Sequence, residues 1–344
     1  MIFKFSFIFV FFLSFNHVFA QRLEAPRSMG AIGDSITAGT LALFEIKKKR
    51  TWPEYRQYRN MIRQYFRNKL DIHSFSYAGL SWSTGYGMSP EDIYEKQKLP
   101  LSSKLNQEAF FEFNDENFPV KSLYYHLKKN NMKRDIQFKN VAVPGDDTHG
   151  MLTEQLVDLN KWSQEQLGQA YPDLVTFLGG ANDLCKRSYD KMTSAREYRR
   201  QVYVTLESIL KKSPKSRVLV MPLMRIDSLT KNLKSEKIFK MKKDRDILTC
   251  KNMWKITQYC PTITRSKNLV EELRLGARIE QYNLALKWVV LSLRAHYSDR
   301  IRLVRNAENQ TIKAEDISID CFHPNVNGQN RLAQAAWKSS WWHK

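Results

Sequence analysis

Two short segments near opposite ends of the chain carry side chains that could together cleave an ester. A Gly-Asp-Ser segment ends at Ser35, and an Asp-Cys-Phe-His segment runs from Asp320 to His323. At a spacing of three residues, Asp320 can reach Nδ1–H of His323 and hold the tautomer whose Nε2 accepts a proton from a serine hydroxyl. These residue types indicate nucleophilic catalysis by Ser35, with His323 as the base and Asp320 as its orienting partner.

Each segment also has an ordinary structural interpretation. A serine that follows a strand commonly caps the next helix by accepting a backbone N–H. An Asp-x-x-His sequence could equally be a turn closed by its own carboxylate. The first segment is not the G-x-S-x-G elbow of α/β-hydrolases, because Thr37 stands where the second glycine would be. The catalytic interpretation of Ser35 therefore depends on other parts of the chain.

Two further segments could supply donors for the oxyanion of a tetrahedral intermediate, which acyl transfer requires. One is an apolar run that ends in Pro-Gly, where the bare backbone N–H of Gly145 can approach a ligand closely. The other is a Gly-Gly-Ala-Asn-Asp segment, which offers the side-chain amide of Asn182. Pro-Gly and Asn-Asp are also common turn pairs, so neither segment is decisive alone.

Short apolar runs alternate with longer amphipathic stretches along the chain, which is typical of a parallel sheet covered by helices on both faces. Three of the four candidate segments then lie at strand ends, where open α/β sheets place their sites. The sequence predicts strands at Ser28–Gly33, Phe138–Val143, Leu174–Leu178, Arg217–Met221 and Ile301–Val304. It predicts helices at Glu54–Leu70, Ser122–Lys129, Met151–Leu167, Ser194–Lys212, Leu269–His296 and Asn327–Trp337.

Two stretches interrupt this alternation, one at about residues 73–119 and a strongly basic one at about 225–267. Long connections in a compact fold are usually functional loops or disordered segments, so both could contact a substrate. We expect a single domain over residues 21–344 with these two insertions. Aromatic residues of the first insertion could line an acyl pocket or belong to the core, namely Phe75, Tyr77, Trp82 and Tyr86.

The first twenty residues have the layout of a secretory signal peptide. Lys4 precedes an apolar run from Phe5 to Phe15, and Val-Phe-Ala ends at Ala20 before a polar stretch. We expect cleavage after Ala20. An uncleaved membrane anchor is the alternative, but the apolar run is shorter than the roughly 20 residues that span a bilayer.

The chain has four cysteines, Cys185, Cys250, Cys260 and Cys321. An even count in an exported protein usually means disulfides rather than free thiols. Three pairings are formally possible. We prefer Cys250–Cys260, which are close in sequence, and therefore Cys185–Cys321, which would tie the loop of Asn182 to that of His323.

A net charge of +20 favours contact with something anionic, and after export this could be phospholipid headgroups, an outer-membrane glycolipid or an acidic substrate. We expect no nucleic-acid partner, because zinc-finger spacings and aromatic RNA-binding signatures are missing from the sequence. The charge could instead be spread over exposed helix faces and only aid solubility, as the basic runs at residues 47–50 and 242–245 suggest.

The four segments together resemble the signature blocks of the GDSL/SGNH hydrolase family, and more narrowly its phospholipase B branch. The similar segments are Gly33-Asp34-Ser35, Gly79-Leu80-Ser81-Trp82-Ser83-Thr84-Gly85, Val141-Ala142-Val143-Pro144-Gly145, Gly180-Ala181-Asn182-Asp183-Leu184-Cys185 and Asp320-Cys321-Phe322-His323. The resemblance implies a flavodoxin-like, three-layer α/β/α sandwich with a mostly parallel five-stranded sheet, and neither a metal nor an organic cofactor. It implies a Ser35–His323–Asp320 triad and an oxyanion hole made by the N–H groups of Ser35 and Gly145 and the Asn182 amide.

We therefore expect an exported serine esterase acting on phospholipids or other lipid esters, with peripheral contact to an anionic membrane surface. An esterase of soluble substrates, such as a carbohydrate deacetylase, is the alternative because fold and triad are shared across such substrates. A hypothesis of another class is a non-catalytic membrane- or glycolipid-binding protein. The sequence predicts no particular oligomeric state.

Overall fold

A computed structural model describes residues 23–40, 42, 76, 78–85, 120–130, 135–239, 248–265 and 268–343. The expected signal peptide at residues 1–20 and the expected helix at 54–70 lie outside the described residues. So does most of the insertion at 73–119.

The central sheet has five parallel strands in the order β2-β1-β3-β4-β7. Their bounds are β1 (Ser28–Gly33), β2 (Gln137–Asn140), β3 (Leu174–Leu178), β4 (Arg217–Val220) and β7 (Ile301–Leu303). The chain continues beside β1 after β2, since Val141 and Val143 donate to the carbonyls of Ala31 and Gly33. The predicted parallel α/β architecture is therefore confirmed: β1 and β3 have the predicted bounds, and the ends of the other three strands differ by up to three residues.

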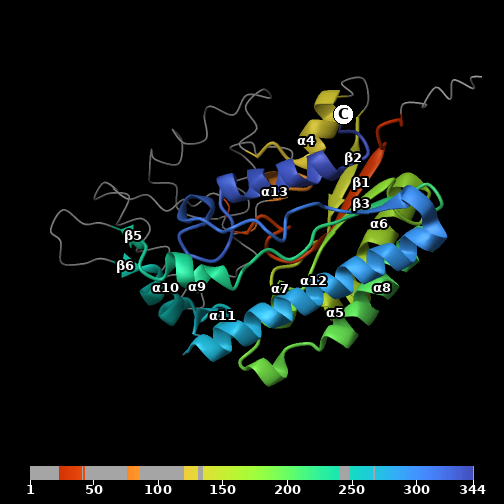
Figure 1. Ribbon diagram of the computed structural model, residues 1–344. Helices are drawn as coiled ribbons and strands as arrows, with labels where there is room; N and C mark the ends of the chain where they lie inside the picture. Colours follow the sequence, from red (N-terminus) through yellow and green to blue (C-terminus); the bar gives the residue numbers. More distant parts are fainter. Residues whose placement is uncertain are drawn as a thin grey trace, which may run out of the picture.

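Helices cover both faces of the sheet (Figure 1). One face carries α6 (Leu156–Leu167), α8 (Ala195–Lys212) and α12 (Leu269–Tyr297), and the other carries α4 (Leu123–Asn130) and α13 (Val326–Ser339). A π-helical turn at Met151–Gln155 leads into α6. Within the described part of the chain, no helix combines the length and the apolar character that crossing a membrane would require.

The core is divided between the two faces because successive strand residues point to opposite sides of a sheet. In β3, Val175 and Phe177 pack toward α6, α8 and α12, whereas Leu174 and Leu178 pack toward α4 and α13. Every residue of β1 and β3 is buried. This continuous burial on both faces is the pattern expected of central parallel strands.

The basic insertion is largely folded rather than an open loop. It contains α9 (Ser228–Leu233), β5 (Lys237–Phe239), β6 (Leu248–Thr249), α10 (Cys250–Thr257) and α11 (Pro261–Thr264). Thr249 caps α10, and β5 pairs with β6 in a small antiparallel sheet. The remaining short helical turns are Ala78–Leu80, α5 (Thr148–Gly150), α7 (Ala181–Leu184), Tyr189–Lys191, Ser298–Arg300 and Ala314–Asp316.

Candidate active site

The loop of Ser35 begins where β1 ends and is held by two buried glutamines. Oε1 of Gln155 accepts the N–H of Gly33, and its Nε2 donates to the Gly33 carbonyl, both at 2.9 Å. On the other side, Nε2 of Gln329 donates to the carbonyl of Ile36 at 2.8 Å. A Cβ at Gly33 would collide with the side chain of Thr37, so only glycine fits where the strand turns into the loop.

Ser35, His323 and Asp320 form one hydrogen-bonded chain. Oγ of Ser35 lies 2.9 Å from Nε2 of His323, and Nδ1 of His323 lies 2.5 Å from Oδ2 of Asp320. The other carboxylate oxygen of Asp320 accepts the backbone N–H groups of Phe322 and His323, both at 3.0 Å. All three members of the chain are buried. The capping alternative does not apply to Ser35, because residues 35–39 form turns and not the start of a helix.

The loop that carries His323 is fixed at both ends. The N–H of Ser318 donates to the His323 carbonyl at 2.7 Å, and Asn325 caps α13 by accepting the N–H of Gly328. In the middle of the loop, Nε1 of Trp254 donates to the carbonyl of Cys321 at 3.0 Å. The imidazole is therefore oriented by its surroundings as well as by Asp320.

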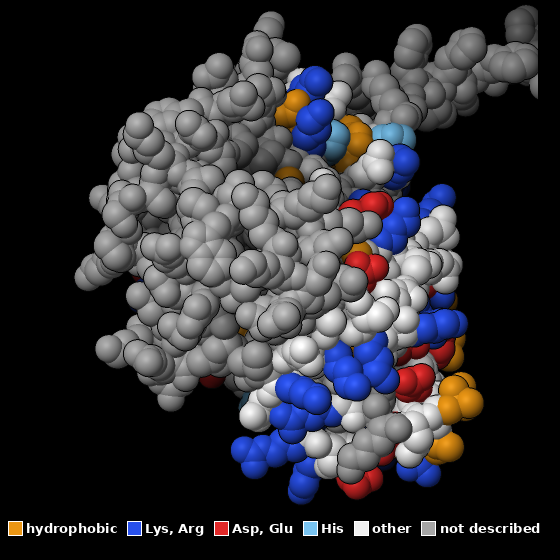
Figure 2. Space-filling model, turned by 90° about the vertical axis from the view of Figure 1, so that its left-hand side faces the viewer, with side chains coloured by type: hydrophobic (Ala, Val, Ile, Leu, Met, Phe, Trp, Pro, Cys, Tyr) orange, Lys and Arg blue, Asp and Glu red, His pale blue; other side chains and the backbone are white. Residues whose placement is uncertain are grey.

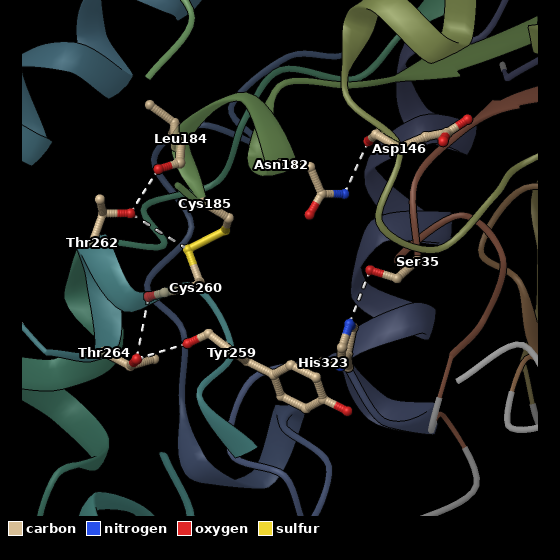
Figure 3. The surroundings of a disulfide bond; sticks show 10 residues. All are labelled: Ser35, Asp146, Asn182, Leu184, Cys185, Tyr259, Cys260, Thr262, Thr264 and His323. Atoms are coloured by element: carbon tan, nitrogen blue, oxygen red, sulfur yellow. Dashed lines mark hydrogen bonds between the residues drawn. A yellow bond between two sulfur atoms is a disulfide. The ribbon is translucent and has the colours of Figure 1, made fainter. Parts of the chain in front are cut away.

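The two candidate oxyanion segments lie beside Ser35 (Figure 3). Gly145 has a positive φ of 91°, and Nδ2 of Asn182 donates to the carbonyl of Asp146 at 2.9 Å. Asn182 and Ser35 line the same cavity, whose walls are mainly apolar. Neither the N–H of Ser35 nor that of Gly145 donates to an acceptor within the described residues.

Two buried carboxyl groups, Asp34 and Asp183, are sequence neighbours of the candidate site residues Ser35 and Asn182. Asp34 is fully buried, its Oδ2 has no hydrogen-bond partner in the described structure, and burial raises its pKa to about 7 against the lowering effects of the Ile36 N–H and His323. Burial also raises the pKa of Asp183, although Thr148 donates to this carboxyl through both its N–H and its hydroxyl. These carboxyls make folding stability depend on pH.

We expect the Asp34→Asn variant to lose part of that dependence. Folded Asp34 keeps its proton up to about pH 7, whereas the pKa of an exposed aspartate is about 3.8. Protonated Asp34 therefore adds up to about 4 kcal/mol to the free energy of unfolding. This contribution is complete below about pH 4 and is lost as the pH rises to about 7. Urea unfolding at several pH values should show a flatter profile for Asp34→Asn, and an unchanged slope would contradict the assignment.

The disulfides are Cys185–Cys260 and Cys250–Cys321, so both preferred pairs, Cys250–Cys260 and Cys185–Cys321, were wrong. Cys250 begins α10, and an eight-residue helix of about 12 Å then separates it from Cys260. Each cysteine is bonded instead to a partner more than 70 residues away in the sequence. Residues 250–260 form a bridge that Cys250 bonds to the His323 loop. At its other end, Cys260 is bonded to Cys185, which directly follows α7, the helix that carries Asn182 (Figure 3).

We expect reduction of these bonds to lower turnover before it unfolds the protein. A displacement of about 1 Å at a catalytic group can cost up to about 100-fold in rate, and both active-site loops depend on the bridge. Ester hydrolysis and near-UV circular dichroism should be followed together during titration with dithiothreitol. Loss of both signals at the same reductant concentration would show that the bonds support only the fold.

Sequence reasoning left Trp82 open and missed the two glutamines. Trp82 is fully buried, and its backbone N–H donates to Oε1 of Gln329 at 2.9 Å, so it belongs to the core under the Ser35 loop. Phe75, Tyr77 and Tyr86 lie outside the described residues. Gln155 occurs within a predicted helix, where only its place on the inward face could have indicated a structural role.

The fold is an open, all-parallel five-stranded sheet with helices on both faces, as expected for the GDSL/SGNH class. The chain belongs to the GDSL-like lipase/acylhydrolase family, whose model matches residues 29–336. Membership of this family supports a hydrolase, with the substrate left open. None of the curated proteins gives a significant match.

Several solved structures are similar to this chain at low sequence identity. The α/β hydrolase LAE5 from the metagenome of Lake Arreo is 14% identical, with a TM-score of 0.44 over 94% of this chain and 99% of that one. A GDSL-like lipase from Parabacteroides merdae is 10% identical, with a TM-score of 0.44 over 92% and 96%. An acetylxylan esterase from Geobacillus stearothermophilus is 14% identical, with a TM-score of 0.44 over 93% and 98%.

Proposed function

We propose that this protein is an exported serine esterase that hydrolyses phospholipids or other lipid esters through an acyl-enzyme intermediate. The observation that carries the proposal is the hydrogen-bonded chain from Ser35 through His323 to Asp320. Membership of the lipase/acylhydrolase family supports the reaction type. The lipid substrate is supported by the resemblance to the phospholipase B branch and by the basic surface.

In the proposed reaction, Oγ of Ser35 attacks the ester carbonyl while Nε2 of His323 takes its proton. Asp320 stabilises the imidazolium that forms. His323 then gives the proton to the leaving alcohol as the ester bond breaks, which leaves the acyl group on Ser35. A water molecule that is deprotonated by His323 releases the acid and restores the serine.

The oxyanion would be stabilised by the backbone N–H groups of Ser35 and Gly145 and by the amide of Asn182. Both backbone donors are left unused by the described residues, which supports this role. Asn182 donates one of its two amide hydrogens to the Asp146 carbonyl, so the other can be donated to a substrate.

We expect Asn182→Ala to lower kcat by roughly 100- to 1,000-fold, the usual effect of losing one oxyanion donor. KM should change much less, because the donor acts mainly on the transition state. Asn160→Ala is a matched control, since Asn160 also donates to a backbone carbonyl, that of Ala170, but lies in α6. Equal losses in the two variants would contradict an oxyanion role for Asn182.

The size and lining of the cavity beside Ser35 indicate which acyl groups could bind there. Its apolar walls include Ile36, Ile226, Ile312 and Phe322, which suits a hydrocarbon chain. Its volume is only about 40 Å³, however, which holds a few water molecules at most. A long acyl chain would require these side chains to separate. The narrow cavity therefore favours a second candidate function, the removal of short acyl groups such as acetyl from carbohydrates.

Product analysis separates these two functions. The purified mature chain should release fatty acid from phosphatidylcholine vesicles faster than it releases acetate from acetylated sugars. Activity on acetylated sugars without activity on any lipid would end the phospholipase proposal.

Export is a further part of the proposal, supported by two disulfides, which form in oxidising compartments. Sequencing the mature protein should give Gln21 as its first residue, and a retained N-terminal segment would contradict cleavage.

A further inference from the structure

A cationic pocket lies in the folded insertion, between α9, α10 and α11. It has a volume of about 310 Å³, at the lower end of the roughly 300–1,000 Å³ typical of small-ligand sites. Four cationic side chains line it, Lys234, Lys251, Lys255 and Arg265. Trp254, which is 2% exposed, also lines it and gives it a rigid wall. We call it the cationic pocket.

The cationic pocket brings like charges together. None of its four cations forms an ion pair with another residue that the structure describes. Lys251 and Lys255 are four residues apart on one face of α10, where like charges repel. An oxyanion such as a phosphate group would relieve this repulsion and gain several charge-assisted contacts.

Exposed apolar residues follow the pocket directly in the chain. Leu269, Val270 and Leu273, in the first turns of α12, are 68%, 57% and 64% exposed. Leu269 is four residues after Arg265, so their Cα atoms lie within about 14 Å of each other. Cations beside exposed aliphatic side chains suit an anionic bilayer, where the cations meet phosphates and the apolar residues enter the acyl boundary. A polyanionic polysaccharide would leave those apolar residues in water.

This face lies at the same edge of the molecule as the candidate active site. The chain of α12 runs back to β7, so the helix begins at the carboxyl edge of the sheet, beside α11 (Figure 1). Trp254 of the pocket donates to Cys321, and Cys250 is bonded to it. On the face that Figure 2 shows, Lys and Arg side chains lie over the lower and right-hand parts, with Asp and Glu side chains among them. A bilayer bound here would lie near Ser35.

We propose that the cationic pocket and the exposed start of α12 seat this protein on anionic bilayers, with a lipid phosphate group in the pocket. This inference deepens the proposed function and rests on its lipid substrate. It assigns membrane contact to particular residues rather than to the overall charge of the chain. It also explains why the most basic insertion is folded and disulfide-bonded to the loop of His323.

Sedimentation with vesicles tests the proposal without requiring turnover. The Ser35→Ala protein should bind vesicles of 70% phosphatidylcholine and 30% phosphatidylglycerol at constant ionic strength, and should bind pure phosphatidylcholine weakly. In the same background, Lys251→Gln with Lys255→Gln should weaken binding by about 30-fold, at about 1 kcal/mol for each cation. Lys211→Gln with Lys212→Gln is the matched control, because these exposed lysines end α8 at the opposite edge of the sheet. Melting temperatures of all variants check that they are folded.

Several results would overturn the proposal. Equal weakening by the two lysine pairs would mean that diffuse charge alone binds the membrane. Binding of inorganic phosphate in calorimetry without vesicle binding would assign the pocket to a free anion. Binding of dextran sulfate without vesicle binding would assign it to a polysaccharide. If the Ser35→Ala protein binds vesicles as expected but the wild type releases no fatty acid, the proposed substrate fails while the docking surface stands.

Discussion

Replacing Ser35 with alanine should reduce ester hydrolysis by roughly 10⁶-fold, and His323→Ala should cost about as much. The two side chains are joined by a 2.9 Å hydrogen bond and act in the same step, so either loss removes the nucleophilic mechanism. The double variant should be no worse than either single variant. Turnover of a chromogenic short-chain ester by the three proteins measures this directly.

A control for this experiment is Ser163→Ala. Ser163 is fully buried in α6, and its hydroxyl has no hydrogen-bond partner among the described residues. Its removal should therefore leave turnover close to that of the wild type. Additive losses in the double variant, or near-normal turnover in either single variant, would refute the assignment of Ser35 and His323 to one catalytic unit.

The Asp320→Asn variant should lower turnover by roughly 10⁴-fold with little change in KM. An asparagine can still accept the backbone N–H groups of Phe322 and His323, which keeps the loop in place. Its amide nitrogen, however, would face Nδ1 of His323 and favour the tautomer in which Nε2 carries the proton. That tautomer cannot accept the proton of Ser35.

Steady-state kinetics and a melting curve together test this expectation. The melting temperature should fall only modestly, because the backbone hydrogen bonds to residue 320 are retained. An Asp320→Asn protein that is folded and within tenfold of wild-type kcat would show that Asp320 does not set the tautomer of His323. A comparable rise in KM would instead mean that Asp320 contributes to substrate binding.

The sheet and the helices that cover it could be predicted because their patterns are local. Continuous apolar runs such as Leu174–Leu178 mark strands buried on both faces, and caps such as Ser194 mark the start of a helix. The polar segments at strand ends could be gathered into one site for the same reason, since parallel strands end at one edge. Ser35 and His323, 288 residues apart, lie within hydrogen-bond distance, although His323 precedes α13 rather than following a strand.

Features that depend on packing between distant segments could not be predicted. Gln155 and Gln329 reach the Ser35 loop from 122 and 293 residues away, and nothing in their local sequence marks them. The disulfide pairing failed because α10 was not expected, so Cys250 and Cys260 were treated as the two ends of a small loop.

Labelling with a fluorophosphonate tests the central claim most directly. The phosphorus of this probe is attacked by an activated serine, and fluoride leaves, so a stable adduct marks the nucleophile. Peptide mapping of the labelled wild-type protein should place a single adduct on Ser35, and His323→Ala should greatly slow its formation. An adduct on another residue, or an unlabelled folded protein, would contradict nucleophilic catalysis by Ser35.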